Sequence, residues 1–178
     1  MIIRAALIAS LIGLSACAQL GTTDVAAPEA ASFKTTSDII GSTGAKIGTA
    51  NLTGGPNGIL VRVEIMPRSL SSGWHGIHFH QIGDCSDVGV FKKSGGHVGL
   101  IEGGHGLLNP VGPEAGDIPN IFAHADGSAG YEIFTDLITT EQLFDADGTA
   151  LVIHANEDDH VSQPIGGAGP RIACGVIK

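Results

Sequence analysis

The 178-residue sequence is poor in aromatic residues. Phe, Trp and Tyr together make up 4% of the chain, whereas glycine contributes 27 residues. Such a composition suits many short strands joined by turns better than a helical bundle, and no segment combines helical periodicity with helical length. The length allows one domain of ordinary size plus a short additional segment. We therefore expect a single all-β domain.

Basic residues are half as numerous as acidic residues. Nine Lys and Arg stand against eighteen Asp and Glu, which gives a formal net charge of −9. A protein that binds a nucleic-acid backbone needs a basic face to displace counterions, so this balance argues against a nucleic-acid partner. An anionic ligand would need a locally positive site, such as a metal ion or a well-placed arginine.

The longest early apolar run is too short to span a bilayer. Residues 1–17 carry one charge, Arg4, followed by an apolar stretch and small residues, which predicts a signal peptide. The ending "LSAC", with Cys17 last, resembles the lipobox of bacterial lipoproteins, in which the cysteine is lipidated. The alternative is a plain cleavage site within "ACA" that removes Cys17. Either alternative exports the protein to the periplasm or cell envelope, and the lipobox favours a lipid anchor to a membrane.

Cysteine is also scarce, with three residues in the chain. Setting aside Cys17 leaves Cys85 and Cys174 as an even pair in a compartment that permits disulfides. A bond between them would stabilise the fold by roughly 4 kcal/mol in the chain-entropy account. The alternative, two buried free thiols, is uncommon outside the cytoplasm.

The rest of the chain alternates strand and turn signals. Residues 18–36 are small, polar and aperiodic, which predicts a flexible tether before a domain at 37–178. The clearest strand, 59–66, alternates apolar and charged residues. Further strands are expected at 46–52, 74–82, 129–137 and 149–155. Two long connections, about 83–120 and 156–170, lack strand pattern, and such loops in a compact domain usually carry function.

Eight histidines are distributed unevenly through the chain, none of them in the signal peptide. His78 and His80 are two residues apart, so on a strand both imidazoles leave the same face. His75 lies an odd number of residues from each and is expected to be a structural or surface residue. Three more histidines lie near long loops or strand ends: His97, His105 and His154. Together these residues predict a copper or zinc site, because imidazole is a preferred ligand of both ions.

Several motifs, in the right order and with similar spacing, resemble the exported bacterial branch of the copper/zinc superoxide dismutase family. They are "GWHGIHFHQIGDC", "SGGH", "GD" followed by "PN", "ADG", "LVIHANEDD" and "GGAGPRIACGVI". The resemblance covers residues 37–178. It implies a Greek-key flattened β-barrel or sandwich of about eight antiparallel strands with two long functional loops. It also implies an oxidoreductase that dismutates superoxide to oxygen and hydrogen peroxide and protects the cell envelope.

The resemblance further implies two metal ions that share one ligand. The copper ligands would be His78, His80, His97 and His154. The zinc ligands would be His97, His105, Glu114 and Asp117. His97 would thus bridge the two ions as an imidazolate, and during turnover it would release copper, take a proton and deliver it to the reduced oxygen.

Position 114 departs from the family pattern, because most members have histidine there. A carboxylate is a legitimate zinc ligand, so a four-ligand site remains available with Glu114. Glutamate nevertheless differs from imidazole in reach and charge, which affects affinity and selectivity. The alternative is that Glu114 points to solvent and zinc keeps three protein ligands or is lost. A non-enzymatic copper- or zinc-binding protein on the same fold is the corresponding alternative function.

The resemblance assigns roles to two more residues. Asp158 would accept hydrogen bonds from His78 and His105 and so connect the copper and zinc halves. Arg171 would guide the anionic substrate beside copper, supported by the Cys85–Cys174 disulfide; its alternative is a surface arginine that pairs with a loop acid. His124 and His160 have no family role and are expected to be exposed. Dimer contacts differ between branches of the family, so a homodimer and a monomer are both compatible with the sequence.

Overall fold

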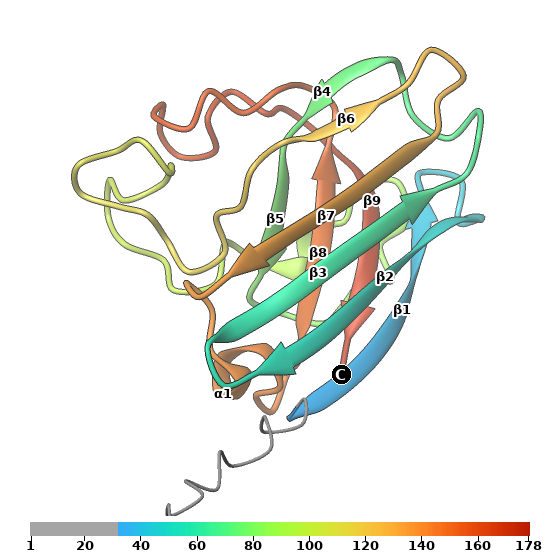
Figure 1. Ribbon diagram of the computed structural model, residues 1–178. Helices are drawn as coiled ribbons and strands as arrows, with labels where there is room; N and C mark the ends of the chain where they lie inside the picture. The colour runs from blue at the N-terminus through green and yellow to red at the C-terminus, as the bar shows by residue number, and fades with distance from the viewer. Residues whose placement is uncertain (1–31) are drawn as a thin grey trace, which may run out of the picture.

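The computed structural model describes residues 32–178, which form nine strands and two short helices (Figure 1). Residues 1–31, including Cys17, the expected signal peptide and most of the expected tether, lie outside the described residues. The strands are β1 (Phe33–Gly41), β2 (Lys46–Gly55), β3 (Gly58–Ile65), β4 (Gly73–His75), β5 (Ile77–His80), β6 (Ile121–Ala123), β7 (Ala129–Thr135), β8 (Thr149–His154) and β9 (Arg171–Ile177). The helices are a 3-10 turn, η1 (Lys92–Ser94), and α1 (Thr140–Leu143). Across residues 32–178, neither helix has the length and apolar character to cross a membrane.

Seven strands form one antiparallel sheet in the order β5-β8-β9-β1-β2-β3-β7, and β4 pairs with β6 in a second small sheet. The large sheet curls, so that β5, β8 and β9 lie behind β2, β3 and β7 in Figure 1. One apolar core joins the two halves, with Val61 and Val63 of β3 in the same cluster as Phe79 of β5 and Leu151 of β8. The all-β expectation is confirmed.

The burial pattern of the strands explains where a site can form. β3 alternates buried and exposed residues, as expected for a strand with one face on the core and one in solvent. Every residue of β5 and β8 is buried, so both faces of these strands are covered. Their inner face joins the core, and their outer face lies under the two long loops, residues 81–120 and 155–170.

The disulfide between Cys85 and Cys174 is confirmed and ties the 81–120 loop to β9. Their Cα atoms are 5.9 Å apart, and their positions differ by 89 in the sequence. Cys85 and Cys174 pack in a small apolar cluster with Phe91, Ala150 and Val152 on the outer face of the sheet. The loop that follows β5 is therefore covalently fixed next to the histidine-bearing strands.

Three sequence expectations differ from the structure at element boundaries. The expected strand 74–82 is broken at Gly76 into β4 and β5, which belong to different sheets. A Cβ atom at Gly76 would lie 2.8 Å from the Ala168 side chain, so close approach of the 155–170 loop accounts for glycine at the break. The expected tether, 18–36, runs too far, because β1 begins at Phe33 and its first residues pair with β2. Strands β1, β6 and β9 were not expected; β6 is only three residues long.

Candidate metal centre

Four histidines from three segments converge on one point under the loops. His78 and His80 come from β5, His154 ends β8, and His97 belongs to the 81–120 loop. All four are at most 2% exposed. One ring nitrogen from each lies within 4.8 Å of the corresponding nitrogen of the others. The same-face expectation for His78 and His80 is therefore met, and the fold adds the other two rings.

Each of these four rings uses one nitrogen in a hydrogen bond to an oxygen atom and leaves the other without a partner. The bonded pairs are His78 Nε2 with Asp158 Oδ2 (2.7 Å), His80 Nδ1 with the Gly95 carbonyl (2.9 Å), His154 Nδ1 with the Gly169 carbonyl (2.9 Å) and His97 Nδ1 with Glu114 Oε2 (2.9 Å). A nitrogen that faces such an acceptor carries the proton, so in a neutral ring the second nitrogen has a free lone pair. The unpartnered nitrogens are His78 Nδ1 and the Nε2 atoms of His80, His97 and His154.

Burial keeps three of these rings neutral, those of His78, His80 and His154. Burial lowers the pKa of His78 to about 4 and that of His154 to about 3, and it also lowers the pKa of His80 well below its usual value. Four buried lone pairs without hydrogen-bond donors are costly unless a cation satisfies them. The donor set fits a copper ion, for which imidazole nitrogen is a suitable ligand.

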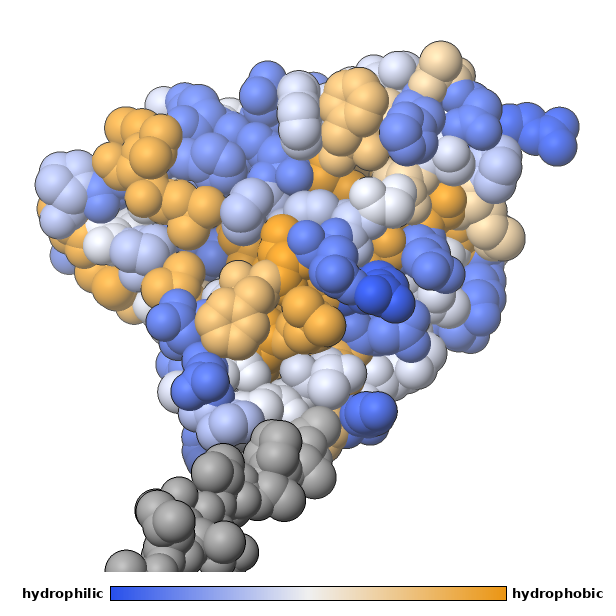
Figure 2. Space-filling view, in the orientation of Figure 1, coloured by the Kyte–Doolittle hydropathy of each residue, from blue (hydrophilic) through white to orange (hydrophobic). Residues whose placement is uncertain are grey.

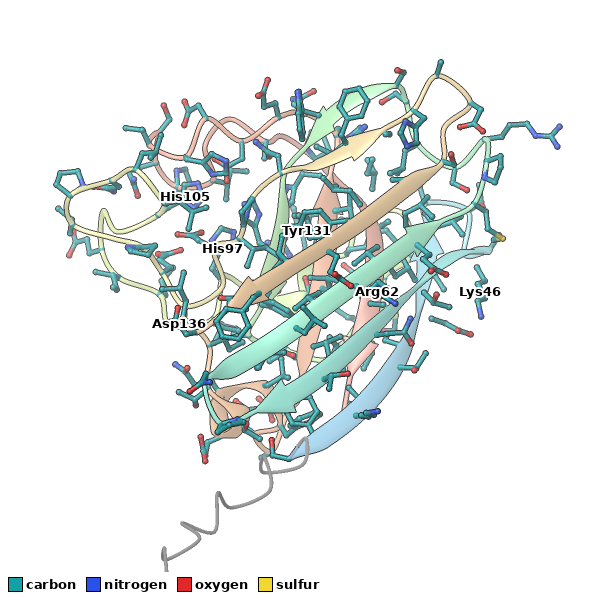
Figure 3. The ribbon with its side chains drawn as sticks, viewed as in Figure 1. Lys46, Arg62, His97, His105, Tyr131 and Asp136 are labelled. Atoms are coloured by element: carbon teal, nitrogen blue, oxygen red, sulfur yellow. A yellow bond between two sulfur atoms is a disulfide. The ribbon has the colours of Figure 1, made fainter. Side chains whose placement is uncertain are left out.

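A second cluster shares His97 with the first. His105 Nδ1 lies 2.9 Å from Asp117 Oδ1, and His97 Nδ1 lies 3.2 Å from the same oxygen. Both histidines and Asp117 are at most 2% exposed, and Figure 3 shows His97 and His105 near one another beside the loops. His78 is also within metal-binding distance of this group, but its Nε2 is hydrogen-bonded to Asp158 and its single free nitrogen serves the first cluster. Imidazole and carboxylate donors together suit zinc.

Glu114 points into the second cluster rather than to solvent. The residue is 2% exposed, and Oε2 accepts from His97 Nδ1 while Oε1 accepts from the Ile101 backbone N–H at 3.1 Å. Its own backbone N–H donates to Asp117 Oδ2 at 2.9 Å. The solvent-facing alternative is therefore wrong, because Glu114 is buried beside His97. The donors that lie within 4.8 Å of one another in this region belong to His78, His97, His105 and Asp117, and Glu114 is next to this group rather than part of it.

Part of the 81–120 loop reverses the usual distribution of polar and apolar side chains, although Phe91, Val98 and Ile118 are buried as usual. Its inward-facing side chains include His97, His105 and Asp117, whereas Leu100 and Leu108 are 69% and 73% exposed. Apolar residues accordingly interrupt the polar surface over the long loops in Figure 2. Buried polar groups are unfavourable unless they are satisfied, so this reversal indicates a functional interior.

Asp158 lies between the two clusters and bonds to a ring of each. Its Oδ2 accepts from His78 Nε2, and its Oδ1 accepts from His105 Nε2 at 3.2 Å. Burial would raise the pKa of Asp158, but the hydrogen bonds from His105 and His78 outweigh this effect and hold the pKa well below its usual range. Burial would likewise lower the pKa of His105, yet Asp117 and Asp158 raise it to about 10. Both His105 nitrogens therefore carry protons in the metal-free protein at neutral pH.

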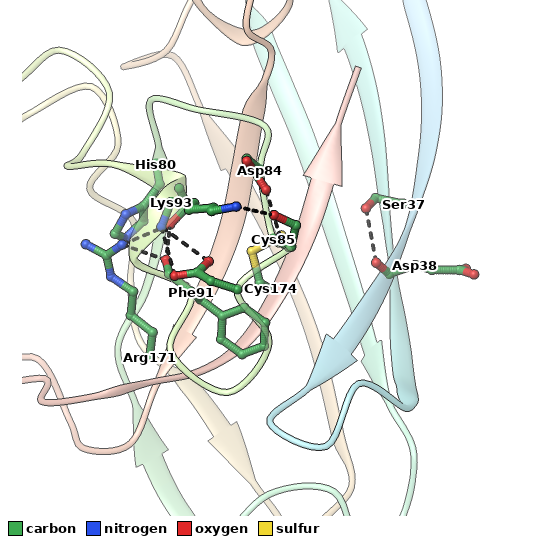
Figure 4. Close-up of a disulfide and its surroundings, with 12 residues drawn as sticks. Ser37, Asp38, His80, Asp84, Cys85, Phe91, Lys93, Arg171 and Cys174 are labelled. Carbon is green, nitrogen blue, oxygen red and sulfur yellow. Dashed lines mark hydrogen bonds between the residues drawn. A yellow bond between two sulfur atoms is a disulfide. The ribbon is translucent and has the colours of Figure 1, made fainter.

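Arg171 opens onto a cavity beside the first cluster. Its guanidinium donates to the Phe91 carbonyl at 2.8 Å and to the Gly95 carbonyl at 2.7 Å, which also accepts from His80 (Figure 4). A cavity of about 410 Å³ is lined by Arg171, His154 and Lys92, among others. Because carbonyl oxygens rather than a carboxylate hold the guanidinium, its positive charge remains available to an anion in the cavity. The alternative of a surface arginine paired with a loop acid is not observed.

The remaining histidines are structural or peripheral. His75 is 1% exposed and bonds to the His154 carbonyl at 2.8 Å and the Ser71 carbonyl at 2.9 Å, as expected for a structural residue. His124 is exposed, as expected. His160 is not fully exposed, because its side chain is 19% accessible and packs beside Asp158. Two amide residues that sequence reasoning missed, Asn120 and Gln163, bond to the backbone of site residues.

Comparison with known proteins gives a consistent result. A sequence model described as copper/zinc superoxide dismutase matches residues 46–177. A copper–zinc superoxide dismutase of Caulobacter vibrioides is 48% identical over 142 residues, which cover 76% of this chain and 80% of the relative. A copper–zinc superoxide dismutase of Aquifex aeolicus is 40% identical over 153 residues, which cover 82% of this chain and 88% of the relative.

Solved structures show the same fold. A superoxide dismutase-like protein from Bacillus subtilis superposes with a TM-score of 0.71 at 28% identity, covering 80% of this chain and 97% of that protein. The copper/zinc superoxide dismutase of Brucella abortus superposes with a TM-score of 0.67 at 28% identity, covering 82% and 100% respectively.

Proposed function

Because the chain belongs to the copper/zinc superoxide dismutase family, we propose that its two buried clusters hold copper and zinc at the residues described above. The chain is an oxidoreductase whose substrate is superoxide and whose cofactors are copper and zinc. The reaction consumes two superoxide ions and two protons and yields oxygen and hydrogen peroxide.

The copper ligands of the proposal are His78 Nδ1 and the Nε2 atoms of His80, His97 and His154. The observation that carries this assignment is that these four buried nitrogens have no hydrogen-bond partner among residues 32–178 and belong to four histidines that each offer a ligand atom within 4.8 Å of the others. The rings of His78, His80 and His154 are each oriented by an oxygen on the other nitrogen, which is the usual arrangement around metal-binding histidines, whereas the other nitrogen of His97 faces the second cluster.

The zinc ligands of the proposal are His97, His105, Glu114 and Asp117. The inward orientation of Glu114 supports its assignment, because a carboxylate, a second carboxylate and two imidazoles make a four-ligand zinc set. His97 presents one nitrogen to each cluster, so a single ring connects the two metal positions.

When bound, copper supplies the one-electron chemistry that the reaction needs. The protein supplies a fixed site and an electrostatic guide. Arg171 faces the cavity with a permanent charge and attracts the substrate anion against a formal net charge of −9. Among residues 32–178, His97 Nε2 has no hydrogen-bond partner, so whenever copper does not occupy this atom the ring could hold a proton there and pass it to the reduced oxygen.

The biological setting of the proposal is the bacterial cell envelope. The predicted signal peptide and the lipobox-like ending at Cys17 support export with a lipid anchor. Labelling with a palmitate analogue tests the anchor, and replacement of Cys17 by alanine should abolish the label and release the protein from the membrane fraction. Labelling that survives this substitution would refute the anchor.

Metal analysis and a superoxide assay test the proposed activity. The purified domain should bind about one copper and one zinc per chain and should consume superoxide. A protein with a full complement of copper but negligible superoxide consumption would instead support a non-enzymatic metal-binding function.

A further inference from the structure

Gln163, on the 155–170 loop, holds the backbone of a proposed zinc ligand on the other loop. Its Oε1 accepts from the His105 backbone N–H at 3.2 Å, and its Nε2 donates to the His105 carbonyl at 2.9 Å. The same carbonyl also accepts from Asn109 Nδ2 at 2.8 Å, whereas Gln163 is the side-chain partner of the N–H. One amide therefore satisfies both backbone groups of His105.

Asn120, on the 81–120 loop, makes the same kind of contact with the backbone of a residue on the 155–170 loop, Asp158. Asn120 Nδ2 donates to the Asp158 carbonyl at 2.8 Å. Its Oδ1 accepts from the Asp158 backbone N–H at 3.0 Å. Asp158 is the carboxylate that bonds to His78 and His105, so Asn120 holds the residue that connects the two clusters.

The two amides tie the loops to one another through site residues. We propose that Gln163 and Asn120 are positioning residues: Gln163 sets the backbone of His105 for zinc, and Asn120 sets Asp158 for both metals. This proposal rests on the proposed metal ligands. In a sheet, a neighbouring strand would satisfy the backbone N–H and carbonyl of such a residue. His105 and Asp158 lie in loops, and the side-chain amide of Gln163 or Asn120 bonds to these two groups instead.

Because Gln163 and Asn120 lie outside the apolar core, their substitution tests the positioning of site residues separately from the stability of the fold. Gln163 is exposed and Asn120 is half-buried, and neither belongs to the apolar core. Their substitution removes hydrogen bonds between loops without opening a core cavity. The two variants should also differ. Among the proposed site residues Gln163 bonds only to His105, with a further local bond to the Val161 carbonyl, whereas Asn120 bonds to Asp158, which in turn bonds to His78 and His105.

Metal affinities of Gln163→Ala and Asn120→Ala, measured by chelator competition, test the proposal. Cobalt(II) replaces zinc as the probe of the second cluster, because its visible spectrum reports ligand geometry. We expect Gln163→Ala to lower cobalt affinity roughly tenfold or more, to change the spectrum and to leave copper affinity nearly unchanged. Asn120→Ala should lower the affinities for both ions. Gln163→Glu keeps an oxygen that can accept from the His105 N–H, so it should lower cobalt affinity less than Gln163→Ala does.

Gln142→Ala is the matched control. Gln142 Oε1 also accepts a backbone N–H, that of Thr139, in the cap of α1. This control should lower thermal stability without changing cobalt affinity or spectrum. If Gln163→Ala does not fold, Gln163→Glu replaces it in the test. The proposal would be overturned if Gln163→Glu kept the wild-type cobalt affinity and spectrum and Asn120→Ala kept the wild-type affinities for both ions.

Two outcomes distinguish failure of the proposed positioning roles of Gln163 and Asn120 from failure of the proposed zinc site. Wild-type protein that binds no cobalt would overturn the proposed zinc site and the positioning roles with it. The positioning roles alone would be overturned if the wild-type protein bound cobalt and Gln163→Ala and Asn120→Ala had the same cobalt affinity as the wild type. They would also be overturned if Gln142→Ala lowered cobalt affinity as much as these two variants.

Discussion

At the scale of single residues, hydrogen-bond acceptors decide which nitrogen of each histidine is free for a metal. The Gly95 and Gly169 carbonyls fix the Nδ1–H tautomers of His80 and His154, while Asp158 fixes the opposite tautomer of His78. The result is one free lone pair per ring, directed to a common point. Affinity for a metal thus depends on atoms that never touch it.

Glu114 provides a direct test of the second cluster. Glu114→Ala should lower zinc content while sparing copper, because the side chain lies 2.9 Å from His97 Nδ1. Glu114→His should restore a three-histidine zinc set and raise zinc affinity or the thermal stability of the metal-loaded protein. Metal analysis and differential scanning calorimetry measure both. Zinc content that stays the same in Glu114→Ala would refute its role as a ligand.

Zinc uptake should release protons. Asp117 and Asp158 raise the pKa of His105 to about 10, so the metal-free protein carries a proton on His105 Nδ1 that zinc must displace. Protons compete with zinc below that pKa, and the apparent zinc affinity should therefore rise with pH, by up to about tenfold per unit for one displaced proton. Isothermal titration in buffers of different ionisation enthalpy measures the release. Binding heats that do not depend on the buffer would contradict this assignment.

At the scale of elements, β5 and β8 can carry the site because both of their faces are buried. Ile77 and Phe79 of β5 point into the core, whereas His78 and His80 point under the loops. This arrangement requires loops that pack closely on the outer face of the sheet. Gly76, between β4 and β5, is a point of such contact, because its N–H donates to the Asn156 carbonyl at 2.8 Å.

Substitution of Gly76 should loosen this contact. A Cβ atom there would lie 2.8 Å from the Ala168 Cβ and 3.3 Å from the Asp158 Cβ, so Gly76→Ala should displace the 155–170 loop and lower the free energy of unfolding by about 1–3 kcal/mol. Gly130→Ala on β7 is the control, because nothing lies within 4 Å of its added Cβ. Chemical denaturation measures both variants. Equal stability of the two would show that the loop accommodates the methyl group.

At the scale of the whole molecule, the net charge repels the anionic substrate, whereas two cationic side chains lie beside the first cluster. The formal net charge is −9, yet Arg171 and Lys92 line the cavity beside His154. The cationic side chains attract the superoxide anion to the cavity, and dissolved salt weakens this attraction by screening the charges.

We therefore expect kcat/KM for superoxide to fall as ionic strength rises. Arg171→Ala should lower kcat/KM at low salt and flatten its salt dependence, while copper content stays the same. Arg171→Lys keeps the charge and should retain part of the salt dependence. Pulse radiolysis across a salt series measures these rates, and a rate that rises with salt in the wild-type protein would contradict local steering.

The sequence by itself determined the all-β class, the placement of His78 and His80 on one strand face and the cysteine pair. These features follow from local periodicity and from counting, which do not depend on how loops fold. It did not separate β4 from β5, because the break at Gly76 depends on a loop more than eighty residues away along the chain.

The tertiary structure alone decided where the loop side chains point. It turned Glu114 inward, brought His97 to His78, His80 and His154 on the strand pair, and placed Gln163 and Asn120 against residues of the opposite loop. Loops without strand or helix periodicity give no sequence signal for side-chain direction, because their paths are set by long-range packing and by hydrogen bonds to distant partners.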